Sequence, residues 1–444
     1  MGLAAAMIVL AACATPGGPQ PPGAATGGAQ TQATAAAPRG TLKIAWGTEP
    51  EGLSPKLAVG AGLANYQWIF DSYLTYFDFQ GQVHPMLAKS IPTQENGDWV
   101  VNADGTMATT YHLRENARWH DGTPLTARDY VFGFEVTIDT DVPVRIRLPE
   151  TYMSGVEAAD DYTLVVKWSQ PYVGANTLTY QQLNPLPTHL MGDKYRRNKA
   201  NFIFGEEWTS AYVGTGPFRI ERWNPGTSLI ARAFPDWVLG PPKIETVEVR
   251  FISDARTAVA NILAGEVDLI SSPWSSAQDA ALIRQQWAES NAGYIRTGLR
   301  ALHLLAFQFR EVPNWQRAMT DLRVRKALMH ATDRVALGEV MTAGLGRPAD
   351  AFAIPSDVIF PRIDAALTKY PFDVSRAGTL LAEAGWTRST PTGLLTNPSG
   401  QTLDMELWDT PGDGGETSAI LADGWKAVGI NTSTFTIAAA RQRD

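Results

Sequence analysis

The segment Arg118–Glu135, with the sequence RWHDGTPLTARDYVFGFE, carries the strongest local structural information in the chain. Its dipeptide Asp121-Gly122 predicts a turn, because glycine adopts the positive φ that tight turns require. Thr126 stands three residues before Asp129, which is the spacing of a capping box in the first turn of a helix. The residues that follow at helical intervals are Val131, Phe134, Glu135 and Ile138. We therefore expect a turn followed by a capped helix.

Strand signals lie on both sides of this segment. Leu42–Ala45 has the apolar character of a buried strand. Residues 99–113 alternate in polarity and contain Asn102–Gly105, a hairpin signal. A second hairpin is predicted within 218–234, where Asn224-Pro225-Gly226 separates two strand-like runs.

Four further helices are predicted from apolar stripes with helical spacing, bounded by capping residues or glycines. They comprise the stripes Val259–Leu263 after Asp254, Val324–Ala331, Ala377–Ala384 after Asp373, and Leu421–Val428 before Gly429. Helices that alternate with short strand-like runs favour α/β or α+β layers over a β-sandwich or a helical bundle.

Composition excludes several classes of protein. The chain has 444 residues, of which 44% are hydrophobic and 18% charged, so it is neither wholly disordered nor collagen-like. A formal net charge of −8, without any run of five like charges, argues against nucleic acid as a partner. No apolar run approaches the roughly 18 residues that a membrane-spanning helix needs.

The amino-terminal region differs in composition from the rest. Met1–Pro38 contains no charged residue, and Leu3–Ala12 is an unbroken apolar decamer followed by Cys13, the only cysteine. Leu-Ala-Ala-Cys resembles the lipobox of bacterial lipoproteins, in which the cysteine is acylated after cleavage. We expect residues 1–13 to be a signal peptide that ends in the lipidation site. Ala14–Pro38, built from Ala, Thr, Pro, Gly and Gln, is expected to be a disordered tether.

The common enzyme motifs are absent: the chain has no Gly-x-Ser-x-Gly, His-Glu-x-x-His or Gly-x-x-x-x-Gly-Lys segment. None of the six histidines is paired at helical spacing, so we expect no metal site and no cofactor. The adjacent carboxylates Asp160-Asp161 and Glu206-Glu207 are interpreted as solvated surface. A secreted, tryptophan-rich hydrolase of polysaccharide or peptide remains the alternative function.

Tryptophan is abundant, with 14 residues. Most aromatic rings are expected in the core, but rings beside turns at strand ends are candidates for a ligand pocket. These candidates are Trp46, Trp274 and Trp408.

The segment Arg118–Glu135 resembles the signature of the family 5 extracellular solute-binding proteins, the peptide, dipeptide and nickel receptors of ABC importers. The resemblance extends over nearly the whole chain after Arg39. Further matches occur in the family's order, at Gly47–Pro55, Phe70–Ala88, Gly214–Phe218, Leu263–Asp268 and Asp321–Leu328.

The resemblance implies an α/β fold of the type II periplasmic-binding-protein kind, with two lobes around a cleft and an extra subdomain on lobe I. It places lobe I at residues 39–78 and 200–297, the extra subdomain at 79–199, and lobe II at 298–444. The signature then falls in the extra subdomain, where its role is structural. The family continues beyond Asp444, so we expect lobe II to be incomplete and the chain to be C-terminally truncated.

The resemblance also suggests ligand-binding residues. Glu49 follows the first strand and matches an acidic residue that lies at the ligand in peptide-binding relatives. Trp46 lies on the same stretch, and Trp274 follows a strand predicted at 267–270. Trp408 and Asp409 follow the strand-like run 403–407.

The function expected from these features is that of a non-enzymatic, lipid-anchored receptor of an ABC importer. It would capture a small solute, an oligopeptide above all, between two lobes. Its partners would be that ligand, the membrane permease subunits and the membrane itself through the lipid anchor. We expect the protein to be a monomer in the cell envelope, either in the periplasm or on the outer face of the cytoplasmic membrane. Nickel chelates, sugars and opines remain possible ligands. A further alternative function is that of a purely structural surface lipoprotein.

Overall fold

The computed structural model describes residues 40–54, 56, 63–142, 148–180, 182–271, 276–296, 304–310, 317–351, 353, 355, 359–409 and 414–437. The predicted signal peptide, Cys13 and the tether lie outside these residues, as does Trp274. Within the described part, no helix is both long and apolar enough to cross a membrane.

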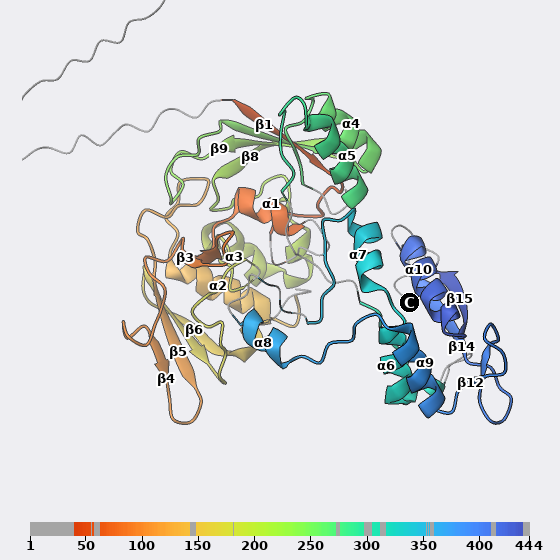
Figure 1. Cartoon of the computed structure of the whole chain (residues 1–444). Helices are drawn as coiled ribbons and strands as arrows, with labels where there is room; N and C mark the ends of the chain where they lie inside the picture. The colour runs from red at the N-terminus through yellow and green to blue at the C-terminus, as the bar shows by residue number, and fades with distance from the viewer. Residues whose placement is uncertain are drawn as a thin grey trace, which may run out of the picture. The chain divides into compact units, whose positions relative to one another are not determined.

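A five-stranded mixed sheet unites the start of the chain with its middle (Figure 1). Its order is β11-β1-β10-β9-β8, with β1 parallel to both neighbours and β9 antiparallel to β10 and β8. The strands are β1 (Thr41–Trp46), β8 (Phe218–Asn224), β9 (Ser228–Ala233), β10 (Thr246–Phe251) and β11 (Leu269–Ile270). The first strand and the second hairpin predicted from sequence are thus confirmed.

The second half of strand β1, Ile44–Trp46, is buried on both faces, whereas Leu42 and Lys43 are half-buried. Ile44 and Trp46 point into one core, which includes residues of α1 (Leu63–Phe70). Ala45 points the opposite way, into a second core. That core includes residues of α4 (Ala255–Leu263) and α5 (Ala277–Trp287). The predicted cap of α4 is confirmed, because the Asp254 side chain accepts from Thr257 N.

A second, four-stranded antiparallel sheet has the order β4-β5-β7-β6. Its strands are β4 (Trp99–Val101), β5 (Met107–His112), β6 (Met153–Asp160) and β7 (Thr163–Trp168). The predicted hairpin joins β4 to β5, and Gly105 has the positive φ of 85° that its turn needs. The remaining elements of this region are β2 (Thr75–Phe77), β3 (Val83–Pro85), α2 (Ala127–Ile138), α3 (Thr188–Arg197), η1 (Glu150–Tyr152), η2 (Lys199–Phe204) and η3 (Glu206–Trp208).

Asp129 explains why the signature segment folds as it does. Its carboxylate accepts from Thr126 N at 2.9 Å, which caps α2, and from the Trp119 indole at 3.3 Å. The other oxygen accepts from Thr188 N at 3.1 Å and from Thr188 Oγ1 at 2.7 Å, at the start of α3. One carboxylate, 5% exposed, therefore joins the turn and two helices. The predicted turn and capped helix are confirmed.

The last part of the described chain has its own core. Its strands β14 (Asp404–Asp409) and β15 (Asn431–Thr436) pair in parallel, and α10 (Gly414–Ala427) connects them. The helices predicted from the stripes Val324–Ala331, Ala377–Ala384 and Leu421–Val428 are confirmed as α6, α9 and α10. The other elements here are η4 (Arg317–Thr320), α6 (Leu322–His330), α7 (Arg334–Thr342), α8 (Phe360–Ala366), α9 (Val374–Glu383), β12 (Thr387–Arg388) and β13 (Leu395–Thr396).

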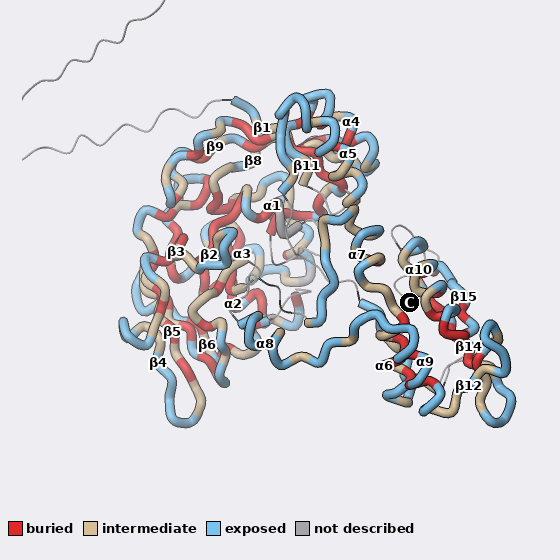
Figure 2. The backbone as a smooth tube through the Cα atoms, in the orientation of Figure 1, coloured by how far each residue is buried: buried red, intermediate tan, exposed pale blue. Residues whose placement is uncertain are grey.

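Buried residues occur in both sheets and in the carboxyl-terminal part of the described chain (Figure 2), and the predicted mixture of helices and strands is confirmed. The strand predicted at 267–270 is shorter, since only Leu269–Ile270 pair with β1. Strand β14 is longer than the predicted run, because its pairing with β15 continues to its last residue. Trp408 and Asp409 are therefore the final residues of the strand and do not follow it.

Candidate functional site

The carboxyl end of β1 carries the first group of predicted ligand residues. The Glu49 carboxylate accepts from the Trp223 indole at 2.6 Å and from Gly226 N at 2.8 Å. Both donors belong to the β8–β9 hairpin, so Glu49 ties the end of β1 to that turn. A carboxylate offers about four acceptor positions, and these two hydrogen bonds use two of them.

Trp46 lies within the core of the same layer. It is 2% exposed, and its ring stacks on Tyr66 with ring centroids 3.9 Å apart. The Tyr66 hydroxyl donates to Thr48 O at 3.0 Å. Burial, with a smaller contribution from the Glu49 charge, raises the pKa of Tyr66. In this structure Trp46 supports the end of β1 and presents almost no surface to a ligand.

The carboxyl end of β14 carries the second group. Trp408 is 61% exposed, and its ring lies against Phe435 of β15 with centroids 5.1 Å apart. Oxygen Oδ1 of Asp409 is buried and has no hydrogen-bond partner. Ligands of open α/β sheets bind beyond the carboxyl ends of parallel strands, so this edge suits a ligand.

Sequence reasoning missed Phe435. The parallel register places it directly beside Trp408, and together the two rings form an exposed aromatic pair. The only signal in the sequence was an aromatic residue within a strand-like run, and the pairing partner of that run is not visible in sequence.

The predicted site residues thus fall into two groups. Trp46 and Glu49 lie at the end of β1, and Trp408 and Asp409 at the end of β14. Among the described residues, no hydrogen bond or ring contact joins one group to the other. Their role in ligand binding stays a prediction.

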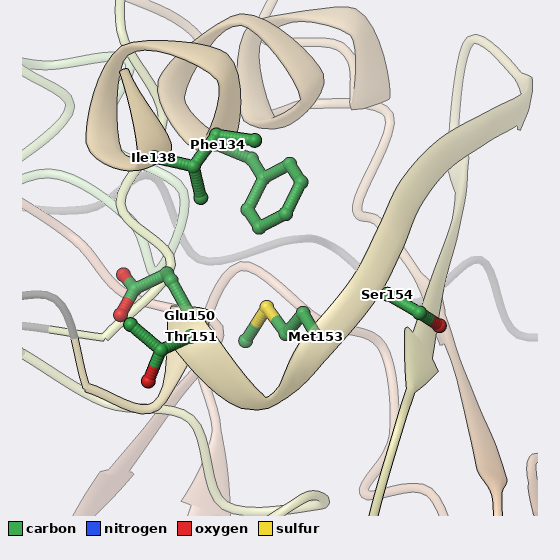
Figure 3. A pocket seen from close by; sticks show the side chains of 6 residues that line it. All are labelled: Phe134, Ile138, Glu150, Thr151, Met153 and Ser154. Atoms are coloured by element: carbon green, nitrogen blue, oxygen red, sulfur yellow. The ribbon is translucent and has the colours of Figure 1, made fainter. Parts of the chain in front are cut away.

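A separate pocket of about 360 Å³ lies between α2 and the η1–β6 segment (Figure 3). Phe134 and Ile138 stand on one side and Met153 on the other, and Thr151 and Ser154 also line the pocket. Glu150 also lines it but is 2% exposed, and its Oε1 accepts from Leu183 N at 2.7 Å. Its other carboxylate oxygen, Oε2, is buried without a hydrogen-bond partner. The pocket therefore combines apolar walls with hydroxyl groups and one buried carboxylate.

The described residues contain no group of three or more His, Cys, Asp or Glu side chains arranged to hold a metal ion.

Comparison with known proteins identifies the class. Residues 82–444 match the model of the bacterial extracellular solute-binding proteins, family 5 Middle. The chain belongs to this family.

Individual proteins with similar sequences carry names that fit this family. A putative ABC transporter peptide-binding protein of Brucella ovis is 26% identical over 364 residues, which are 80% of this chain and 63% of the relative. The oligopeptide-binding protein AppA of Bacillus subtilis is 26% identical over 365 residues, 82% of this chain and 63% of that protein. The chain thus spans about 63% of the length of these curated relatives.

Solved structures show the same fold. NikA of Brucella suis in complex with Fe(III)-EDTA superposes with a TM-score of 0.69 at 21% identity, covering 90% of this chain and 76% of NikA. AppA of Bacillus subtilis with a bound nonapeptide gives a TM-score of 0.64 at 23% identity, covering 90% and 75% of the two chains. The predicted α/β fold of type II periplasmic-binding-protein kind is confirmed.

Proposed function

We propose that this protein is the solute receptor of an ABC importer and that it captures oligopeptides without chemical conversion. The observation that carries the proposal is the family match over residues 82–444. The mechanism follows from the fold class: a ligand that touches both lobes favours the closed state through its higher affinity for that state.

Two features of the described residues support a peptide as ligand. The Glu49 carboxylate retains acceptor capacity for an ammonium or amide N–H group beyond its two protein donors. The exposed pair of Trp408 and Phe435 offers ring faces for apolar side chains. A peptide carries both kinds of group.

The protein is further proposed to be exported and to be held at the membrane through a lipid on Cys13, within reach of the permease. Two acyl chains give durable attachment where one is marginal. Membrane fractionation of wild type and Cys13→Ser tests the anchor. We expect the variant in the soluble fraction, and equal membrane retention of both would refute the anchor.

Mass spectrometry of small molecules released from the purified protein tests the ligand class. We expect a mixture of short peptides that is recovered unchanged after prolonged incubation. A metal chelate, an opine or a sugar in place of peptides would overturn the ligand assignment and leave the receptor proposal intact. Steady release of cleaved peptide or saccharide would instead support the hydrolase and contradict the receptor.

A further inference from the structure

A buried junction joins the chain after α1 to the chain before β8. Three hydrogen bonds join Ser72 and Thr215. Ser72 N donates to Thr215 Oγ1 at 3.0 Å, Ser72 Oγ donates to Thr215 O at 2.9 Å, and Thr215 Oγ1 donates to Ser72 O at 3.5 Å. Gly216 N donates to Phe70 O at 2.8 Å. A Cβ atom on Gly214 would lie 2.0 Å from Phe70 O, so the two segments touch backbone to backbone. We call residues 70–73, residues 212–216 and His120 the Asp71 junction.

Asp71 is an acid without a counter-charge in this junction. It is 8% exposed, and its Oδ1 accepts from the Tyr212 hydroxyl at 2.6 Å. Its Oδ2 is buried and has no partner. The polar atoms of the Gln67 side chain and the Tyr73 hydroxyl, also buried, make no hydrogen bond. Because none of the ion pairs between described residues includes Asp71, a proton is the simplest means of neutralising it.

His120 is a base held neutral on the other side of the junction. Its Nδ1 accepts from Gly214 N at 3.1 Å, and its Nε2 lies 3.1 Å from Gly216 O. The first contact requires a lone pair and the second requires an N–H, so the neutral Nε2–H tautomer satisfies both. A proton on Nδ1 would set one N–H against another. The ring is 5% exposed.

The other titratable groups that act on these two residues leave this assignment unchanged. Tyr73 and Tyr212 influence Asp71, and both are neutral phenols with raised pKa values because burial disfavours their charged forms. Arg219 and Asp121 act on His120 with opposite signs. No fixed charge therefore substitutes for the proton on Asp71.

We propose that Asp71 and His120 form a compensating pair that keeps this junction closed from acid to neutral pH. The closed junction requires a proton on Asp71 and requires that His120 carry none beyond Nε2–H. When Asp71 loses its proton to solvent, an uncompensated carboxylate remains inside the junction. When His120 gains one, the contact with Gly214 N is lost. The two responses have opposite pH dependence.

The signs follow from linkage. Burial, partly offset by the Tyr212 hydrogen bond, raises the pKa of Asp71 from 3.8 to about 7. Through Asp71, stability therefore falls as pH rises from about 4 to about 7. Burial, partly offset by the hydrogen bond to Gly216, lowers the pKa of His120 from 6.5 to about 4. Through His120, stability rises over nearly the same interval. The sum of the Asp71 and His120 contributions to stability therefore changes little with pH, which suits a protein exposed to the external medium.

Urea unfolding of the whole chain at several pH values between 4.5 and 7 tests the pair. Asp71→Asn imitates the protonated acid and removes the falling contribution. The ratio of wild-type to variant unfolding constants should rise with pH by up to about tenfold per unit. His120→Gln retains one donor and one acceptor and removes the rising contribution. The ratio of wild-type to His120→Gln unfolding constants should fall with pH by a similar factor per unit.

The double variant is the sharpest comparison, because its profile should again be as shallow as that of the wild type. Asp161→Asn, which alters an exposed acid 3.4 Å from Arg128, serves as the control and should keep the wild-type profile. Should either single variant unfold with the same pH dependence as wild type, the compensating pair is refuted. A variant that only weakened packing would shift stability equally at every pH. Hydrogen exchange of the Ser72 and Gly216 amides, compared across the same variants, locates the effect in the junction.

Discussion

At the scale of single residues, Asp129 does more than its position in a helix suggests. Its carboxylate serves the first turn of α2, the Trp119 indole and the start of α3. The sequence predicts the capping role, because capping is local and its spacing is fixed. It does not predict the bonds to Thr188, which lies 59 residues further along the chain. That partner is chosen by tertiary packing.

Replacing Asp129 by Ala should lower the free energy of unfolding by about 2–4 kcal/mol. The change leaves the buried indole N–H and two partly buried backbone N–H groups without their acceptor, and such unpaired groups are costly. Chemical denaturation at neutral pH measures the loss. Glu135→Ala on the exposed side of the same helix is the control and should change stability little. Equal effects of the two substitutions would contradict the role given to Asp129.

Glu49 offers a second test at this scale. Glu49→Gln replaces one carboxylate oxygen by an amide donor, which then faces either the Trp223 indole N–H or Gly226 N–H. We expect a loss of about 1–3 kcal/mol in unfolding free energy. Trp223→Phe in a double-mutant cycle checks the pair: the two losses should not add. Strict additivity would show that the contact contributes nothing.

At the scale of elements, helices were easier to predict than strand partners. The stripe of α6 and the Asp373 cap of α9 depend on residues within two turns, so they appear directly in the sequence. The register that sets Trp408 beside Phe435 depends on two strands separated by α10, and no local pattern encodes it. For the same reason the predicted strand end at 407 was two residues too early.

Gly424 shows what the contact between α10 and α6 demands. A Cβ atom there would lie 2.5 Å from Ala331 O, at the end of α6. Gly424→Ala should therefore destabilise the protein by about 1–3 kcal/mol through overpacking. Gly378→Ala is the matched control, because Gly378 lies in α9 with no atom within 4 Å of an added Cβ. The control should stabilise by up to about 1 kcal/mol. Thermal unfolding that ranks the two variants in the reverse order would refute this account of the packing.

At the scale of the whole molecule, family resemblance predicted the fold class where local pattern alone gave only a mixture of helices and strands. The five-stranded sheet explains the difference. It pairs β1 with β10, about 200 residues further along the chain, and sequence period carries no information on such pairing. Sequence period likewise could not predict how the candidate site is assembled, because its two residue groups come from strands in separate cores.

Ligand binding should depend on both groups if the proposed receptor mechanism holds. A solute that favours the closed state must contact both lobes, so losses on either side should weaken the same equilibrium. We expect Trp408→Ala and Phe435→Ala each to raise the Kd of a co-purifying peptide by roughly tenfold, since a ring contact contributes about 0.5–1.5 kcal/mol beyond its area. Glu49→Gln should raise it as well. Isothermal titration calorimetry provides the measurement, and Phe372→Ala, which alters another half-exposed ring, is the control. A Kd that responds to Glu49 and ignores the aromatic pair would place the peptide on one lobe only, and closure driven by contacts to both would then be excluded.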